Sequence, residues 1–197
     1  MDAPTIKGVA IGAFFQWYRD KFGDDYVRER IRRLPPALVA QIRIDETELG
    51  IDDAQWYPAS LVHGLLDSVA VGMSEAERQR LMQAGAQAAL AATLRGVYKL
   101  LFDSMMTPER YLRRAQALFS RYFNTGTMTK VAEGPTAHLT LIHNWTSHHP
   151  LLCDFVRYSA ETVYGRMGCQ EVESTRLSCV DEDSELCSFR VTWSSVG

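Results

Sequence analysis

The sequence predicts an α+β fold, with a mostly helical part over residues 1–125 and a β-β-α-β-β part over residues 126–197. Before Gly126, apolar residues recur at intervals of three and four, and helix-capping residues precede these runs. After Gly126, the runs are short and rich in Thr, Val, Leu and aromatic residues, which is typical of strands. We therefore expect a single domain, residues 1–197, in which a helical half packs on a four-stranded antiparallel sheet with a covering helix.

The helices of the first part are predicted from apolar spacing and from capping residues. Ser74 and Glu77 form the pattern of a capping box, and Thr107-Pro108 is an N-cap followed by proline at the first helical position. Gly85, inside the longest helix, is small enough to allow close packing against a neighbouring helix. The expected helices cover residues 12–22, 25–34, 58–72, 74–105 and 108–123.

The strands and the single helix of the second part are predicted from composition and from proline and glycine. The helix begins at Pro150, with His149 in the N-cap position, and ends near Arg166, where Gly165 and Gly168 terminate it. The strands are expected at residues 127–133, 137–145, 170–180 and 186–193.

Composition excludes several classes of function. The formal net charge is −3 and the pI is near 6, so nothing favours non-specific binding to nucleic acid. No signal peptide or membrane-spanning run is recognisable, so we expect a cytoplasmic protein that does not enter a membrane. In that compartment the four cysteines are expected to be reduced, either free or bound to metal.

Residues 138–155, HLTLIHNWTSHHPLLCDF, hold four of the five histidines of the chain. In a strand His138 and His143 point to opposite faces, because their separation of five is odd. His148 and His149 follow in a loop, where neighbouring imidazoles diverge. The pattern therefore argues against a four-histidine metal site and favours ordinary hydrogen-bonded histidines.

The cysteines form a better candidate. Cys179 and Cys187 flank the loop between the last two strands, so a hairpin in which they face each other brings two thiols together. The covering helix can then place Cys153 on that pair. The same register pairs Leu177 with Phe189 and Thr175 with Val191.

Two interpretations of these thiols remain open. Three thiolates around one point suit zinc, whereas buried cysteine is also a common small core residue. The chain has no C-x-x-C pair, which would have strengthened the metal interpretation, and Cys169 is expected to be structural.

The opening stretch, IKGVAIGAFFQWYRDKFGDDYVRERI, resembles the first helices of the haem nitric-oxide/oxygen-binding (H-NOX) family. Residues 107–193 are similar to that family and to the related four-vinyl-reductase-type ligand-binding domains. The whole chain also resembles a haem-nitric-oxide-binding-like family that is common in myxobacterial bacteria. The residues that carry the N-terminal resemblance are Lys7-Gly8, Gly12, Arg19-Asp20, Gly23 and Asp25.

The resemblance implies a zinc site. Some members of the haem family, and phenol-sensing activators with a related domain, have zinc at a helix–hairpin junction, and Cys153, Cys179 and Cys187 match those positions. The fourth ligand of that pattern falls on Arg176, which cannot bind zinc. The resemblance therefore implies three cysteine ligands and leaves the fourth to water or to another residue, such as Glu173.

The resemblance also implies where haem contacts would lie. The Tyr-x-Ser-x-Arg motif that binds haem propionates falls on Trp145, Ser147 and His149, where only the serine is kept. The histidine that binds the haem iron would lie near Gln116, on a helix without histidine or cysteine. We therefore expect a haem-free protein, with a haem-based gas sensor of atypical ligation, through Tyr111 or Tyr122, as an alternative.

We expect a non-enzymatic sensory or regulatory module that binds an apolar small molecule or a signalling protein. The alternative is an adaptor or dimerisation module without a ligand, for example a homodimer. No P-loop, G-x-S-x-G, HExxH or nucleotide fingerprint supports an enzyme. An apolar cleft would be lined by Phe102, Met105, Met106, Phe119 and Leu141, but these residues equally suit an ordinary filled core, which we favour for any single one of them.

Overall fold

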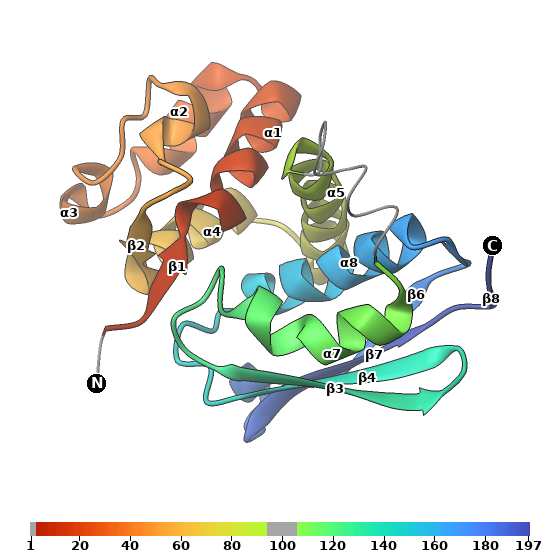
Figure 1. Ribbon diagram of the computed structural model, residues 1–197. Helices are drawn as coiled ribbons and strands as arrows, with labels where there is room; N and C mark the ends of the chain where they lie inside the picture. The colour runs from red at the N-terminus through yellow and green to blue at the C-terminus, as the bar shows by residue number, and fades with distance from the viewer. Residues whose placement is uncertain (1–2, 94–105) are drawn as a thin grey trace.

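The computed structural model describes residues 3–93 and 106–197. Figure 1 shows a sheet along the lower side of the molecule, with two helices over one of its faces and the remaining helices beyond them. This arrangement confirms the α+β fold.

The helical part follows the sequence pattern closely. The helix expected over residues 12–22 is confirmed to the residue, whereas the next one ends at Ile31 rather than at residue 34. The expected continuation of the longest helix beyond Thr93, with Phe102 and Met105 of the expected cleft, lies outside the described residues. The elements are β1 (Thr5–Lys7), η1 (Gly8–Ala10), α1 (Gly12–Phe22), α2 (Asp24–Ile31), α3 (Pro36–Val39), η2 (Thr47–Gly50), β2 (Trp56–Pro58), α4 (Ala59–Ala70), α5 (Glu75–Thr93) and α7 (Pro108–Phe119).

Side-chain caps fix the start of the three helices for which they were predicted. The backbone N–H of Ser74 donates to the Glu77 carboxylate at 2.7 Å, which confirms the capping box of α5. The hydroxyl of Thr107 accepts from the backbone N–H of Arg110 at the start of α7. His149 caps α8 (Pro150–Arg166), where its Nδ1 accepts from the backbone N–H of Leu151 at 3.2 Å. These caps explain why the predicted starts of the helices are accurate.

The main sheet has the order β3-β4-β7-β6 and is antiparallel throughout. The predicted strand over residues 170–180 is interrupted, so that a short strand at its start pairs with the C-terminal end of the chain instead. The strands are β3 (Thr127–Gly134), β4 (Ala137–His143), β5 (Cys169–Gln170), β6 (Glu173–Ser178), β7 (Leu186–Thr192) and β8 (Ser195–Val196), with η3 (Val180–Glu182) between β6 and β7.

The predicted register of the β6–β7 hairpin is wrong for most of its length. Arg176, not Leu177, lies opposite Phe189, and Ser174, not Thr175, lies opposite Val191. The register shifts by one residue between Arg176 and Ser178, which marks a β-bulge. Leu177 is the extra residue and is 47% exposed. Beyond the bulge Ser178 pairs with Ser188, which restores the predicted register at the end of the hairpin that carries the cysteines.

Two helices cover the same face of the sheet, and the rest of the helical part packs on them. In Figure 1, α7 and α8 lie side by side over the strands, and α5 lies along the far side of α8. A Cβ at Gly85 of α5 would collide with the ring of Phe14 on α1, which confirms that this glycine permits close helix packing. The helical part therefore contacts the sheet mainly through α7 and α8.

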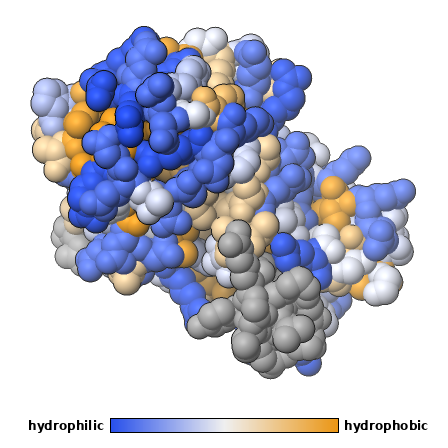
Figure 2. Space-filling model, turned by 90° about the horizontal axis from the view of Figure 1, so that it is seen from above, coloured by the Kyte–Doolittle hydropathy of each residue, from blue (hydrophilic) through white to orange (hydrophobic). Residues whose placement is uncertain are grey.

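The described surface is predominantly polar on the face seen in Figure 2. Hydrophilic side chains cover most of the first helices there, and apolar side chains form small patches between them. Among the described residues, no helix combines the length and the apolar character needed to cross a membrane.

Candidate metal centre

Three elements converge where the covering helix meets the last hairpin. Cys153 lies in the first turn of α8, Cys179 is the N-cap residue of η3, and Cys187 lies in β7. The fourth member is His148, from the loop that leads into α8. The structure thus brings together the three cysteines predicted from the sequence and adds a histidine.

The ligand atoms of the four side chains are close enough together to bind one metal ion. Their ligand atoms all lie within 4.8 Å of one another. His148 Nε2 lies 3.3 Å from Cys179 Sγ, and the Sγ atoms of Cys179 and Cys187 are 3.9 Å apart. The three thiols are buried and are not paired as disulfides. Three sulfurs and one imidazole nitrogen are a common ligand set of structural zinc.

The protonation of the cluster is suited to a cation. A hydrogen bond from Cys153 lowers the pKa of Cys187 to about 4 and that of Cys179 to about 7, although burial opposes both shifts. The contacts of Cys153 with these two sulfurs raise its own pKa, and burial adds to that effect. Burial disfavours the charged form of His148, but contacts with Cys187 and Cys179 outweigh it and raise the pKa. Cys187 and Cys179 therefore lose their protons more readily than an ordinary thiol, and a metal cation can replace the protons that remain.

His148 was missed because nothing in the sequence distinguishes it from His149 as a ligand. The prediction that the two imidazoles diverge is confirmed, and the divergence decides their roles. His148 faces the cysteines, whereas His149 accepts from Leu151 and contacts Asp67 of α4 through Nε2 at 3.1 Å.

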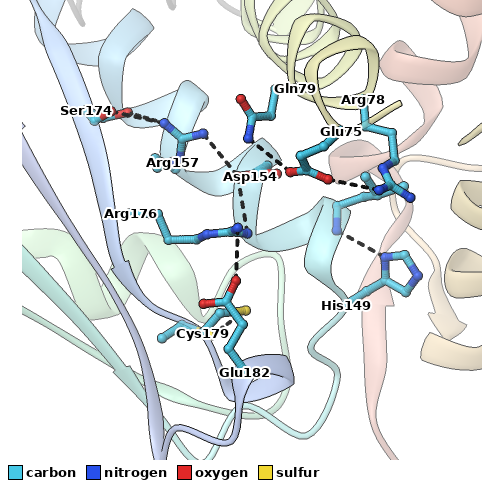
Figure 3. A network of polar contacts seen from close by, with 12 residues as sticks. Glu75, Arg78, Gln79, His149, Asp154, Arg157, Ser174, Arg176, Cys179 and Glu182 are labelled. Carbon is cyan, nitrogen blue, oxygen red and sulfur yellow. Dashed lines mark hydrogen bonds and ion pairs between the residues drawn. The ribbon is translucent and has the colours of Figure 1, made fainter. Parts of the chain in front are cut away.

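Arg176, which lies at the expected position of the fourth ligand, forms ion pairs with carboxylates instead. Figure 3 shows its guanidinium between the carboxylates of Asp154 and Glu182. The distances are 3.9 Å to Asp154 and 3.0 Å to Glu182. Asp154 also accepts from Arg157 at 3.0 Å. This network connects the residue after Cys153 with the loop between the other two cysteines, so it braces the cluster from outside.

The residues at the propionate-motif positions are engaged within the protein. Trp145 is buried against Phe119 and Phe123, with ring centroids 5.5 and 5.1 Å away. The hydroxyl of the buried Ser147 lies 3.0 Å from that of Thr125. The Nε1 of Trp145 is buried and has no partner among the described residues, but the two phenylalanine rings pack against the indole.

The side chain of Gln116, at the position where the iron-binding histidine would lie, also forms hydrogen bonds within the protein. Its side-chain oxygen accepts from the backbone N–H of Met128, and its side-chain nitrogen donates to Ser120 at 2.7 Å. These bonds tie α7 to the start of β3. They use both ends of the amide, so Gln116 has a structural role in this conformation.

Of the residues expected to line an apolar cleft, Met106, Phe119 and Leu141 are described, and Met106 is half-buried. Phe119 is buried in the core, and Leu141 lies on the face of β4 opposite to the buried Thr140 and Ile142. Leu141 therefore points away from the covering helices. Two surface hollows are prominent, of about 570 and 160 Å³, and neither is lined by Gln116, Trp145, Ser147 or His149.

Neither the protein-family models nor the curated protein sequences include a match to this chain. Solved structures do match. The Fe(II) unliganded H-NOX protein from K. algicida is 14% identical, with a TM-score of 0.68 over 96% of this chain and 97% of that chain. A mutant of T. tengcongensis H-NOX is 10% identical, with a TM-score of 0.67 over 97% and 99%. An H-NOX protein from S. oneidensis in the Fe(II)NO ligation state is 13% identical, with a TM-score of 0.66 over 96% and 100%.

The chain therefore has the H-NOX fold over nearly its whole length, as the resemblance of its sequence implied. At 10–14% identity these similarities show the fold alone.

Proposed function

We propose that this chain is a haem-free, non-enzymatic sensory or regulatory module of the H-NOX fold that holds one zinc ion. The observation that carries the proposal is the convergence of His148, Cys153, Cys179 and Cys187, with all ligand atoms within 4.8 Å. Two of the solved neighbours are described as Fe(II) H-NOX proteins, one unliganded and one in the Fe(II)NO ligation state. This chain keeps their fold and concentrates its metal-binding chemistry at a different kind of centre.

The ligand set favours zinc and argues against catalysis. Soft thiolates with one imidazole select zinc among the common divalent ions, and four protein ligands complete a tetrahedral shell. A catalytic zinc ion keeps one position open for water or substrate. The fourth position here is taken by His148, so the centre is suited to holding segments together rather than to chemistry.

The haem-free part of the proposal rests on the residues at the haem positions. Gln116 and His149 use both polar ends of their side chains within the protein, and Ser147 bonds to Thr125. Trp145 packs against two phenylalanine rings and replaces a hydroxyl with an indole. A haem held in the family manner would have to break these contacts without gaining an iron ligand or a guanidinium for its propionates.

The loop of residues 144–149 connects the metal centre to the helical part. The carbonyl of Ser147, next to the metal-facing His148, lies 3.1 Å from His63 Nε2 on α4. His149, on the other side of His148, contacts Asp67 of α4. Binding of His148 to zinc would therefore fix a loop whose neighbouring residues dock α4. A change at the centre would alter how the helical half is held.

Elemental and optical analysis of the reduced, purified protein tests both parts. We expect one zinc ion per chain and no Soret absorption. Cys187→Ser and His148→Ala should lower the zinc content, and Cys169→Ser is the matched control, because Cys169 is a buried thiol outside the cluster. A metal-free reduced protein would contradict the zinc centre, and a Soret band would contradict the haem-free interpretation.

Hydrogen exchange tests the coupling to the helical part. Removal of zinc with a chelator should increase amide exchange in residues 144–149 and in α4, and leave the β1–β2 pair unchanged. Exchange that stays the same in α4 would show that the centre is purely local and not part of a sensory mechanism.

A further inference from the structure

The larger surface hollow, of about 570 Å³, lies between α5, α8 and the edge strand β6. It is separate from the four metal-facing side chains, none of which lines it. Its walls are formed by polar and charged side chains rather than by apolar ones. The lining residues are Gln79, Gln83, Arg157, Tyr158, Glu161, Val172, Glu173, Ser174, Thr175 and Arg176.

Opposite charges occupy opposite ends of this hollow. The order follows from contacts between α8 and β6, which run in opposite directions: Asp154 of α8 meets Arg176, and Glu161, two turns further on, meets Ser174. Arg176 therefore marks the end nearest the cysteines, and Glu161 marks the far end. Since two strand residues span about 6.6 Å, Arg176 and Ser174, which holds Glu161, are spaced by roughly 7 Å along β6.

The anionic end has a carboxylate without a cation. Glu161 accepts from the backbone N–H and the hydroxyl of Ser174, and from Gln83 at 3.3 Å. All three donors are neutral, and no Lys, Arg or His among the described residues forms an ion pair with Glu161. This end of the hollow can accept an ammonium group.

The cationic end is formed by Arg176, while Arg157 lies between the two ends, where it donates to the backbone oxygen and the hydroxyl of Ser174. Arg157 is buried, stacks 4.0 Å from the Tyr158 ring, and has an Nε without a partner among the described residues. Arg176 is more open, and its partner Glu182 is 56% exposed (Figure 3). A ligand carboxylate can replace Glu182 on the Arg176 guanidinium with little cost in burial.

The wall between the two ends suits amide groups. The side-chain nitrogens of Gln79 and Gln83 donate to Glu75 and Glu161, which leaves their oxygens as acceptors. β6 is an edge strand, so its outer backbone groups are not used by a further strand. The hollow therefore offers donors and acceptors along its length as well as opposite charges at its ends.

We propose that this hollow binds a short peptide as a zwitterion, with its carboxylate at Arg176 and its ammonium at Glu161. Two residues span about 7 Å when extended, so a dipeptide matches the spacing of Arg176 and Ser174 along β6. A free amino acid is too short to reach both ends. This inference does not depend on zinc, although Arg176 and Glu182 connect the hollow to the loop between Cys179 and Cys187.

Titration of the purified protein with glycylglycine at constant ionic strength, followed by amide NMR, tests the proposal. We expect saturable shifts at Ser174 and at the Gln79 and Gln83 side chains. N-acetylglycylglycine and glycylglycinamide, which each lack one charge, should bind at least tenfold more weakly, as should glycine. Zinc content is measured after each titration, because a dipeptide amine can itself take up zinc.

Variants test the two ends separately. Arg176→Gln and Glu161→Gln should each weaken glycylglycine binding at least tenfold; Glu161→Gln keeps an oxygen acceptor for Ser174. Arg190→Gln is the matched control, because Arg190 pairs with Glu133 outside the hollow and should leave binding unchanged. Absence of saturable shifts, or equal binding of either blocked peptide, would overturn the proposal, and the blocked peptides decide this even if a variant does not fold.

Discussion

Two buried polar clusters lie under the helices on the same face of the sheet, and they differ in what completes them. At one end, His148 and three cysteines bring four electron-pair donors together around one point. At the other end, Lys130 and His138 bring two bases together, and neither has a carboxylate in contact among the described residues. The first cluster has room for an ion at its centre, whereas the second is filled by side chains.

The contacts of Lys130 show how the second cluster is filled. Its ammonium donates to Thr140 at 2.7 Å and lies 4.9 to 5.5 Å from the rings of Tyr111, Tyr164 and Phe189. Aromatic faces attract a cation, but burial disfavours it more strongly and lowers the pKa of Lys130 to about 7. Burial, with the nearby Lys130, also lowers the pKa of His138. A buried cluster without a carboxylate in contact can therefore do one of two things. It can bind an ion, as we propose for the first cluster, or it can lose a proton at a lower pH than usual, as Lys130 does.

The largest expected effect is the loss of zinc from the first cluster. If free zinc exceeds its Kd a thousandfold, chelation should lower the free energy of unfolding by about 4 kcal/mol. Urea unfolding with and without chelator measures this difference. Cys187→Ser should remove the response to chelator. If the wild-type protein unfolds identically with and without chelator, the thiols are ordinary core residues and not zinc ligands.

The next effect concerns Lys130. In the unfolded chain a lysine has a pKa near 10.4, so between about pH 7 and pH 10 the unfolded chain binds a proton that the folded chain lacks. The free energy of unfolding should therefore rise with pH in this window, by up to about 1.4 kcal/mol per unit. Lys130→Met should remove this slope and stabilise the protein by roughly 3 kcal/mol at pH 7.

Lys21→Met is the matched control for this prediction. Lys21 also lies over an aromatic ring, 5.0 Å from Trp17, but it is exposed. Its substitution should leave both the pH slope and the stability nearly unchanged. Urea unfolding at a series of pH values gives the comparison, and equal slopes for wild type and Lys130→Met would mean that Lys130 keeps its proton among the aromatic rings.

The adjacent histidines allow a sharper test of the first cluster. His148→Ala removes a ligand and should weaken zinc binding roughly 10- to 100-fold or more. His149→Ala removes the N-cap of α8 and the contact with Asp67, so it should cost about 1 kcal/mol and leave zinc affinity unchanged. Zinc competition with a chromophoric chelator separates the two, and equal losses of affinity would contradict the assignment of His148.

The sequence predicted the elements of the fold better than their register. The helix from Pro150 to about Arg166 was predicted correctly, because its cap, its first-turn proline and its terminal glycines are local signals. The bulge at Leu177 left no such signal. The alternation of polar and apolar residues there fits two registers, and only packing of Arg176 against Asp154 and Glu182 decides between them.

Some residues of the two clusters could be predicted from the sequence, and others could not. The three cysteines were found because the hairpin and the helix direct them to one point. The contribution of His148 depends on which way a loop turns, and the burial of Lys130 depends on α7 covering β3. Lys130 and Met128 lie on the same face of β3, because side chains alternate along a strand. The alternation alone does not tell which face a helix will cover.

The smallest effect tests whether the second cluster is held by specific hydrogen bonds. His138 Nδ1 lies 2.5 Å from the hydroxyl of Tyr164, and its ring packs against Trp193 with centroids 5.0 Å apart. Tyr164→Phe keeps the ring beside Lys130 and removes only the hydroxyl, so a buried imidazole nitrogen loses its partner. We expect a loss of about 1 kcal/mol in urea unfolding, with zinc content unchanged because the hydroxyl is remote from the four metal ligands. If Tyr164→Phe instead lowered zinc content, the two clusters would be coupled along α8, and the contrast between an open and a filled cluster would no longer describe independent sites.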